Sequence, residues 1–233
     1  MDWQTFHPGS PVHLIALCTC LAIAVWVAVS HRKRSPGSPD DFARRCIAFL
    51  CLLTWILSVG YWLQPSVLDW SAALPLHFCQ FANLFGAVAI LRKTRIAQSL
   101  LYFWGFALCS WALITPSLSS GPATLWFWVF WFYHLCIPLT LAWILAVDHF
   151  RPTFADWKST LLVTIAFTCA LFFLNLATGW DYGFVGEGKP NHPSPIDFLG
   201  PYPYRVIWML LIGTTLFTLL YLPWIRLQKA SNS

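Results

Sequence analysis

Residues 74–83 concentrate the side chains of this chain that are able to do chemistry. They include an imidazole at His77, a thiol at Cys79 and carboxamides at Gln80 and Asn83. An apolar run follows directly and ends at a basic pair. Polar groups within a membrane helix are costly, so they usually face a protein interior or a wet cavity. The stretch therefore predicts a functional region in the first turns of a membrane helix.

The composition indicates an integral membrane protein. Of the 233 residues, 58% are hydrophobic and only 10% are charged, whereas a soluble domain has about 25% charged residues. A chain so poor in charge cannot cover itself with a water-facing surface. We expect one membrane domain over residues 1–233. The net charge of +5 fits basic loops that lie against lipid headgroups and does not suggest a nucleic-acid partner.

Seven apolar stretches set the expected fold. A helix of roughly 20 residues crosses about 30 Å of hydrocarbon. Alternation with a period of two is absent, and the apolar runs are about twice as long as a barrel strand needs. We predict an all-α bundle of seven transmembrane helices, the third beginning at Pro75. The spans lie near residues 12–30, 43–63, 75–91, 96–115, 124–147, 158–178 and 205–225.

The distribution of Lys and Arg predicts the orientation. Of the 14 basic residues, all but Lys189 and Arg205 fall in alternate loops and in the C-terminal tail. Basic loops stay in the cytoplasm, so we expect the N-terminus outside, the C-terminus inside, and a multi-pass location in the plasma membrane. The charged residues between the fifth and sixth helices are expected to form a solvated loop, which comprises Asp148, His149, Arg151 and Asp156.

The eight cysteines form no C-x-x-C pair and show no zinc spacing. A cysteine in a helix usually packs as a small hydrophobe, and we apply that interpretation to all of them except Cys79. We expect no metal and no cofactor.

The longest loop, residues 181–203, is rich in Gly and Pro but also carries Tyr182 and other apolar side chains. A disordered linker lacks such apolar content. We therefore expect an ordered cap over the outer ends of the helices, followed by Arg205 at the start of the last helix.

The candidate side chains are expected in the outer half of the membrane. Cys79 lies about five residues into the third helix, roughly 7 Å deep, and His134 about ten residues into the fifth, roughly 15 Å deep. We propose Cys79 as a nucleophile with His134 or His77 as its base. The residues expected to line an outward-facing pocket are Gln80, Asn83, Thr115, Asn175, Tyr182 and Arg205.

Helical spacing favours one of the two candidate bases. Residues two apart on a helix do not face the same way, so a Cys–His couple of Cys79 more naturally uses His134 than His77. A structural interpretation stands beside this one, because His and Asn in membrane spans often serve as interhelical hydrogen-bond partners worth about 0.6–2 kcal/mol. Thr115 and Asn175 read as end caps under that interpretation.

Several motifs are spread from the third predicted helix to the last: residues 74–79, 113–116, 132–134, Asn175, Gly179, Tyr182, Lys189, Pro190, residues 194–201, Pro203 and Tyr204. They resemble those of the YwaF-like family of bacterial multi-pass membrane proteins. The resemblance implies a seven-span protein and a distant similarity to a eukaryotic multi-pass acyltransferase that makes ether phospholipids with a cysteine nucleophile. Trp111 and Leu135 differ from the family pattern.

The resulting hypothesis is a membrane protein with an outward-facing polar pocket that binds a lipid or a small amphiphile, with acyl transfer as its chemistry. One alternative is a transporter or permease-like protein, although no internal repeat is visible and no Asp or Glu lies inside a predicted span. The other is a non-catalytic accessory subunit, in which the polar groups only hold helices together.

Overall fold

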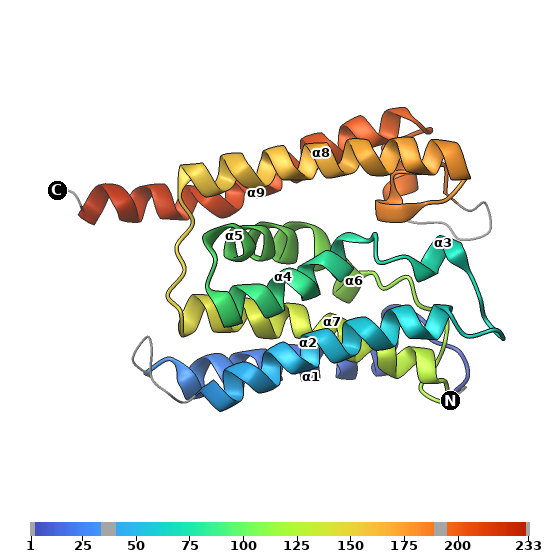
Figure 1. Ribbon diagram of the computed structural model, residues 1–233, viewed down its shortest axis with the longest axis horizontal. Coiled ribbons are helices and arrows are strands. Elements are labelled where there is room, and N and C mark those ends of the chain that lie inside the picture. Colours follow the sequence, from blue (N-terminus) through green and yellow to red (C-terminus); the bar gives the residue numbers. More distant parts are fainter. Residues whose placement is uncertain (1–2, 34–40, 189–194, 232–233) are drawn as a thin grey trace. The chain divides into compact units, whose positions relative to one another are not determined.

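The computed structural model describes residues 3–33, 41–188 and 195–231. Within these ranges the regular structure is helical, apart from one isolated antiparallel bridge between Thr5 and Ser120. The prediction of an all-α fold with seven apolar helical spans is confirmed. In chain order the elements are α1 (Pro11–His31), α2 (Asp41–Trp62), α3 (Trp70–Ala73), α4 (Phe78–Arg92), α5 (Arg95–Trp104), the π-helix η1 (Gly105–Cys109), α6 (Trp111–Ile114), α7 (Leu125–Ala146), α8 (Phe154–Thr178), the 3-10 helices η2 (Tyr182–Phe184) and η3 (Pro195–Leu199), and α9 (Tyr204–Ser231) (Figure 1).

Large apolar side chains are exposed along the long helices. Trp26 of α1, Phe49 of α2 and Phe173 of α8 each leave about two thirds of their surface uncovered, at 66%, 65% and 67%. Water would penalise this surface, whereas lipid tails match it. The helices are therefore apolar on the face that meets solvent as well as inside, as a multi-pass membrane protein requires.

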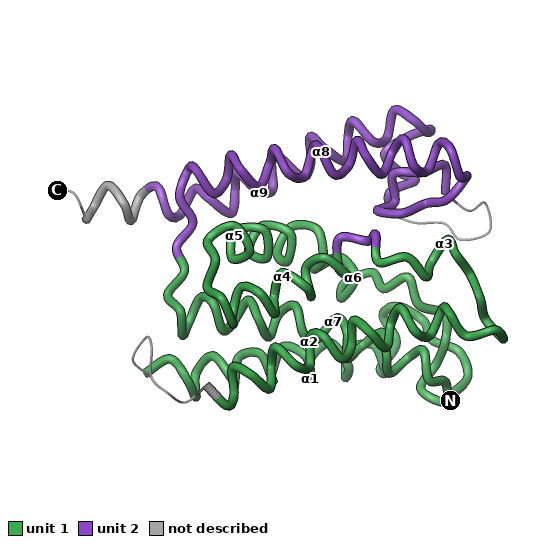
Figure 2. The backbone as a smooth tube through the Cα atoms, in the orientation of Figure 1, with its two compact units in different colours: residues 1–75, 79–150 green, residues 76–78, 151–233 purple. Residues whose placement is uncertain are grey.

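The chain forms two compact units (Figure 2). Unit 1 comprises residues 1–75 and 79–150, and unit 2 comprises residues 76–78 and 151–233. The division falls within the segment that the sequence singles out, because His77 belongs to unit 2 and Cys79 to unit 1. Each unit is described separately below.

Helix α7 is the centre of unit 1. It packs against α1, α2 and α5, and most of its side chains are buried. The Thr124 side chain caps its N-terminus by accepting a hydrogen bond from the Phe127 amide at 3.4 Å. Pro138 lies inside the helix, where it removes the backbone bond to the carbonyl four residues earlier, that of His134.

The third span is interrupted, which corrects its expected start. α3 ends at Ala73 and α4 begins at Phe78, three residues after Pro75. Pro75 therefore lies between the two helices, and so does His77, which is not on a helical face. Cys79 becomes the second residue of α4, closer to the helix N-terminus than the sequence indicated.

The fourth span is also divided. α5 ends at Trp104, a π-helical turn covers Gly105 to Cys109, and α6 completes the span. A π-helical turn inserts one extra residue into the helix and is often found at functional sites. Here it sets the direction in which Cys109 projects, a feature that helical periodicity does not reveal.

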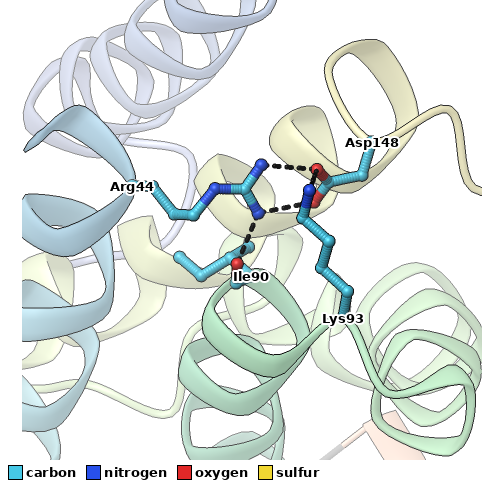
Figure 3. Close-up of polar contacts among 4 residues, drawn as sticks. All are labelled: Arg44, Ile90, Lys93 and Asp148. Atoms are coloured by element: carbon cyan, nitrogen blue, oxygen red, sulfur yellow. Dashed lines mark hydrogen bonds and ion pairs between the residues drawn. The ribbon is translucent and has the colours of Figure 1, made fainter. Parts of the chain in front are cut away.

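A buried ion cluster joins one end of α2, α4 and α7 (Figure 3). Arg44 donates to both carboxylate oxygens of Asp148, at 2.6 and 3.1 Å, and to the Ile90 carbonyl. Lys93 lies 3.6 Å from the same carboxylate, whose side chain is only 2% exposed. The expected solvated loop is therefore wrong at Asp148, because the carboxylate is neutralised by two cations and withdrawn from water.

The start of α2 meets the ends of α4 and α7 in this cluster. At the other end of unit 1, the segment before α1 meets the segment before α7, because the Phe6 amide donates a hydrogen bond to the Ser119 carbonyl at 2.8 Å. Buried His13 closes the same region, since its Nδ1 accepts from the Gly9 amide and its Nε2 donates to the Leu113 carbonyl, both at 2.8 Å. The helices of unit 1 thus alternate in direction as the predicted topology requires.

Unit 2 contains the long helix pair α8 and α9, which pack against each other. A capping box starts α8, because Asp156 accepts from the Thr153 amide at 2.7 Å while Thr153 accepts from the Asp156 amide at 3.4 Å. Asp156 is buried, so the expected solvated loop is wrong here too. Gly179 ends α8 with a φ of 73°, a conformation that favours glycine.

Candidate functional site

Cys79 and His134 come together in unit 1. The Cys79 thiol, in the first turn of α4, has side-chain hydrogen-bonding contacts with the His134 imidazole of α7 and with the Cys109 thiol of η1. A thiol beside an imidazole is the arrangement used for nucleophilic catalysis by cysteine. Of the two candidate bases, His134 is the one that unit 1 supplies to the thiol.

The hydrogen bond of His134 to its own helix defines the tautomer of the neutral ring. Nδ1 lies 2.8 Å from the Phe130 carbonyl oxygen, and this bond is buried. A carbonyl oxygen only accepts, so Nδ1 carries the proton and Nε2 is the acceptor of the neutral imidazole. The ring is held between Phe130 and Tyr133, with centroids at 4.1 and 4.7 Å. His134 is therefore oriented with one nitrogen able to take a proton.

Cys109 adds a second thiol beside Cys79. It is the last residue of η1 and is 1% exposed. The close approach of α5–η1 to α7 depends on Gly105, because a Cβ there would meet a methyl carbon of Leu141 at 2.8 Å. The π-helical turn and this glycine together bring Cys109 to the same point as α4 and α7.

Asn83 joins α4, the helix that carries Cys79, to α7 by a hydrogen bond. Its Nδ2 donates to the Tyr133 carbonyl at 3.0 Å and to the Cys79 carbonyl at 3.4 Å. Both partners only accept, so the orientation of the carboxamide is determined. Asn83 is fully buried, and its Oδ1 has no hydrogen-bond partner. An unsatisfied buried polar atom costs about 1–3 kcal/mol.

Tyr133 presents a second unsatisfied group at the same place. It is 5% exposed, and its hydroxyl makes no hydrogen bond. The hydroxyl nevertheless interacts with the Asn83 carboxamide and with the thiols of Cys79 and Cys109. Buried polar groups without a well-formed hydrogen bond are few in native proteins, and here the Tyr133 hydroxyl and the Asn83 carboxamide oxygen are two such groups in contact.

Helices α4 and α7 also approach closely further along both helices, where Gly86 faces Thr140. A Cβ on Gly86 would lie 3.1 Å from Oγ1 and 3.2 Å from Cγ2 of Thr140. The Thr140 hydroxyl is satisfied within its own helix by the Cys136 carbonyl at 2.8 Å. The small residue in α4 thus permits the spacing that the Asn83 hydrogen bond requires.

His77 belongs to unit 2, where it contacts the predicted cap. Its Nδ1 accepts a hydrogen bond from the Gly183 amide at 3.3 Å, and its ring lies 5.1 Å from that of Tyr182 and 5.8 Å from that of Phe184. Because Nδ1 accepts, the proton of the neutral ring is on Nε2. These contacts place His77 against the cap.

Asn175 fixes the cap to the end of α8. Its Nδ2 donates to the Tyr182 carbonyl at 2.8 Å and its Oδ1 accepts from the Tyr182 amide at 3.0 Å. Tyr182 is fully buried. The part of the cap in residues 181–188 is therefore packed, while Lys189, Pro190 and Ser194 lie outside the described residues.

Arg205 joins two segments of the cap. It donates to the Asp197 carboxylate and to the Gly186 carbonyl, both at 2.6 Å. The residue is 6% exposed, and its Nε has no partner.

Thr115 and Gln80 are the two remaining candidates. Thr115 is half-buried and donates to the Trp111 carbonyl at 3.1 Å, next to the end of α6. Gln80 is buried on α4. That the six pocket-lining candidates share a pocket stays a prediction.

A second group of cysteines lies in unit 1. Cys51 has a side-chain hydrogen-bonding contact with Cys136, whose sulfur is also 3.5 Å from the Thr54 hydroxyl. Cys20 interacts with the same thiol. Three or more His, Cys, Asp or Glu side chains placed to hold a metal ion are not found within the described ranges.

Two residues of the cluster were missed by sequence reasoning. Cys109 was interpreted as a packing cysteine, because nothing in the sequence signals the π-helical turn. Tyr133 lies in the matching segment 132–134, in which the sequence singles out only His134. Its position next to a candidate base was the available signal.

Comparisons with known proteins identify the family. The model of the TMEM164 family matches residues 8–221. An uncharacterised protein of Treponema pallidum (strain Nichols) is 25% identical over 227 residues, which cover 95% of this chain and 87% of the relative. No solved structure matches the chain. The YwaF-like label expected from the motifs is not confirmed; the chain belongs to the TMEM164 family.

Proposed function

We propose that this protein is a membrane-embedded acyltransferase that uses Cys79 as nucleophile and His134 as base on lipid substrates. The observation that carries the proposal is the contact between the Cys79 thiol and a buried imidazole whose Nδ1 donates to the Phe130 carbonyl. The other nitrogen of that imidazole remains to exchange protons. The expected partners are membrane lipids, or a small amphiphile of similar chemistry.

The first half-reaction forms an acyl-enzyme. Nε2 of His134 takes the thiol proton, and the sulfur of Cys79 attacks the carbonyl carbon of a phospholipid ester. The carbonyl electrons move to oxygen and return as the bond to the glycerol oxygen breaks. The leaving alkoxide takes the proton from His134. The products are a thioester on Cys79 and a lysophospholipid.

The second half-reaction passes the acyl group on. The hydroxyl of an acceptor lysophospholipid gives its proton to His134, and its oxygen attacks the thioester carbon. The carbon–sulfur bond breaks, and His134 returns the proton to the sulfur. First-turn amides of a helix have no intrahelical partners, so the start of α4 supplies N–H donors for the oxyanion of both steps.

The orientation belongs to the same proposal. We place the N-terminus outside, the C-terminus in the cytoplasm and the protein in the plasma membrane, on the distribution of Lys and Arg. A green fluorescent protein fused after the last residue folds only in the cytoplasm, and alkaline phosphatase at the same point is active only outside. Fluorescence without phosphatase activity is expected, and the reverse would invert the topology.

Acyl exchange in vesicles tests the chemistry. Purified protein is reconstituted with phosphatidylethanolamine and a deuterated lysophospholipid, and mass spectrometry follows the deuterated diacyl product. Wild type should form it, whereas Cys79→Ala and His134→Asn should not. The matched control is Cys169→Ala, which removes an exposed thiol from α8. Equal product from wild type and Cys79→Ala would refute the proposal and leave the transporter or accessory-subunit alternatives.

A further inference from the structure

The buried hydroxyl of Tyr133 lies in the electrostatic neighbourhood of Cys79 and makes no well-formed hydrogen bond. Tyr133 immediately precedes His134 on α7, and its hydroxyl interacts with the Cys79 thiol. It is buried and makes no hydrogen bond. A phenolic hydroxyl both donates and accepts, and donation to an oxyanion is the stronger of these interactions.

Asn83 holds Tyr133 in this position through the backbone. The 3.0 Å bond from Nδ2 to the Tyr133 carbonyl, with the weaker 3.4 Å bond to the Cys79 carbonyl, links the nucleophile and the tyrosine through one side chain. The Tyr133 hydroxyl also has a side-chain contact with this carboxamide, in which neither the hydroxyl nor Oδ1 makes a well-formed hydrogen bond. The geometry therefore holds a donor near the sulfur without consuming it in a well-formed bond.

We propose that the Tyr133 hydroxyl is an oxyanion donor for the tetrahedral adduct formed when Cys79 attacks an acyl carbonyl. This assignment rests on the proposed acyl-transfer function and adds a catalytic side chain to it. As the Cys79 sulfur bonds to the carbonyl carbon, the π electrons pass to the oxygen, the thiol proton passes to His134, and Tyr133 donates to the new oxyanion. The substrate class is a carboxylic ester or thioester with its carbonyl at the sulfur.

A trifluoromethyl ketone that carries an alkyl chain tests the assignment. It forms a reversible hemithioketal with a cysteine, so its inhibition constant reports oxyanion stabilisation. Iodoacetamide alkylates the same thiol by direct displacement, in which no oxyanion forms, and reports the intrinsic reactivity of Cys79. The two probes separate the stabilisation of an adduct from the accessibility and nucleophilicity of the sulfur.

Tyr133→Phe should weaken hemithioketal formation by about 100- to 1,000-fold, the usual loss on removing one oxyanion donor, while the alkylation rate changes little. Tyr102→Phe is the matched control, since Tyr102 is also buried in unit 1 but packs on Phe103 and Phe150. It should leave both probes unchanged.

Two results would overturn the assignment. An unchanged inhibition constant in Tyr133→Phe would show that the hydroxyl does not meet the oxyanion. A parallel loss of ketone binding and alkylation would show that the hydroxyl only supports the packing around Cys79. If wild type is alkylated at Cys79 but forms no ketone adduct, the acyl-transfer function itself is wrong and Tyr133 falls with it.

Discussion

Asn83 of α4 donates a hydrogen bond to the backbone carbonyl of Tyr133 in α7 over 3.0 Å. This bond connects the helix that begins next to Cys79 with the helix that carries His134. In a membrane span the carbonyl has no water to replace the amide. The relative position of the thiol and the imidazole therefore depends on one carboxamide.

Replacing Asn83 by leucine should remove this connection. Loss of the buried bond is expected to cost about 1–3 kcal/mol of stability. It should also slow acyl exchange by more than the fall in melting temperature would explain. Thermal unfolding in detergent and the vesicle exchange assay measure the two effects. Asn83→Leu with wild-type exchange would mean that the carboxamide does not position Cys79.

The ion cluster at Arg44 and Asp148 should behave as a coupled buried pair. Asp148→Leu should destabilise the protein by about 3–5 kcal/mol, because it leaves Arg44 without its carboxylate away from water. Arg44→Met should cost less, because Lys93 still lies 3.6 Å from the carboxylate. The double variant should lose less than the sum of the two, since no charge is then stranded. Thermal unfolding of the four proteins gives the cycle, and strictly additive losses would contradict the pairing.

The contact of Gly86 with Thr140 predicts a steric effect. Gly86→Val would place methyl groups against a side chain already 3.1 Å from the Cβ position, at a cost of about 1–3 kcal/mol. Gly60→Val in α2 is the control, because nothing lies within 4 Å of a Cβ at that position. Equal melting temperatures for the two variants would show that α4 and α7 do not pack this closely.

The adjacent thiols of Cys79 and Cys109 should form a disulfide on mild oxidation with copper phenanthroline. Peptide mass spectrometry without reduction should then find the two cysteines joined, with loss of acyl exchange that a reductant restores. Cys18, exposed on α1, should stay unlinked in the same sample. A persistent failure of the pair to join while other thiols oxidise would contradict its proximity.

The membrane fold was accessible from the sequence because it follows from composition. A helix that crosses a bilayer needs a long apolar run. The segment between the basic residues Arg95 and Arg151 is long enough for two spans, and Pro116 marks the turn between them. The breaks inside spans were not accessible. The start of α4 at Phe78 and the π-helical turn ending at Cys109 depend on packing between helices, which hydropathy does not record.

The candidate site was partly predictable for the same reason. Cys79, His134 and Asn83 were identified as polar groups in apolar surroundings. Tyr133 and Cys109 resemble ordinary apolar side chains in composition, and only the fold brings them to the thiol. Asp148 was misjudged because its partner Arg44 lies 104 residues away in the chain, a distance over which local pattern carries no information.

The acyl-enzyme is the central claim, and intact-protein mass spectrometry tests it most directly. Wild-type protein incubated with phospholipid donor and no acceptor should gain the mass of one acyl chain, on a peptide containing Cys79, and lose it in neutral hydroxylamine. Cys79→Ala should gain none, and Cys109→Ala should still gain it. An acyl chain on another residue, or none on wild type under conditions that support exchange, would contradict the account.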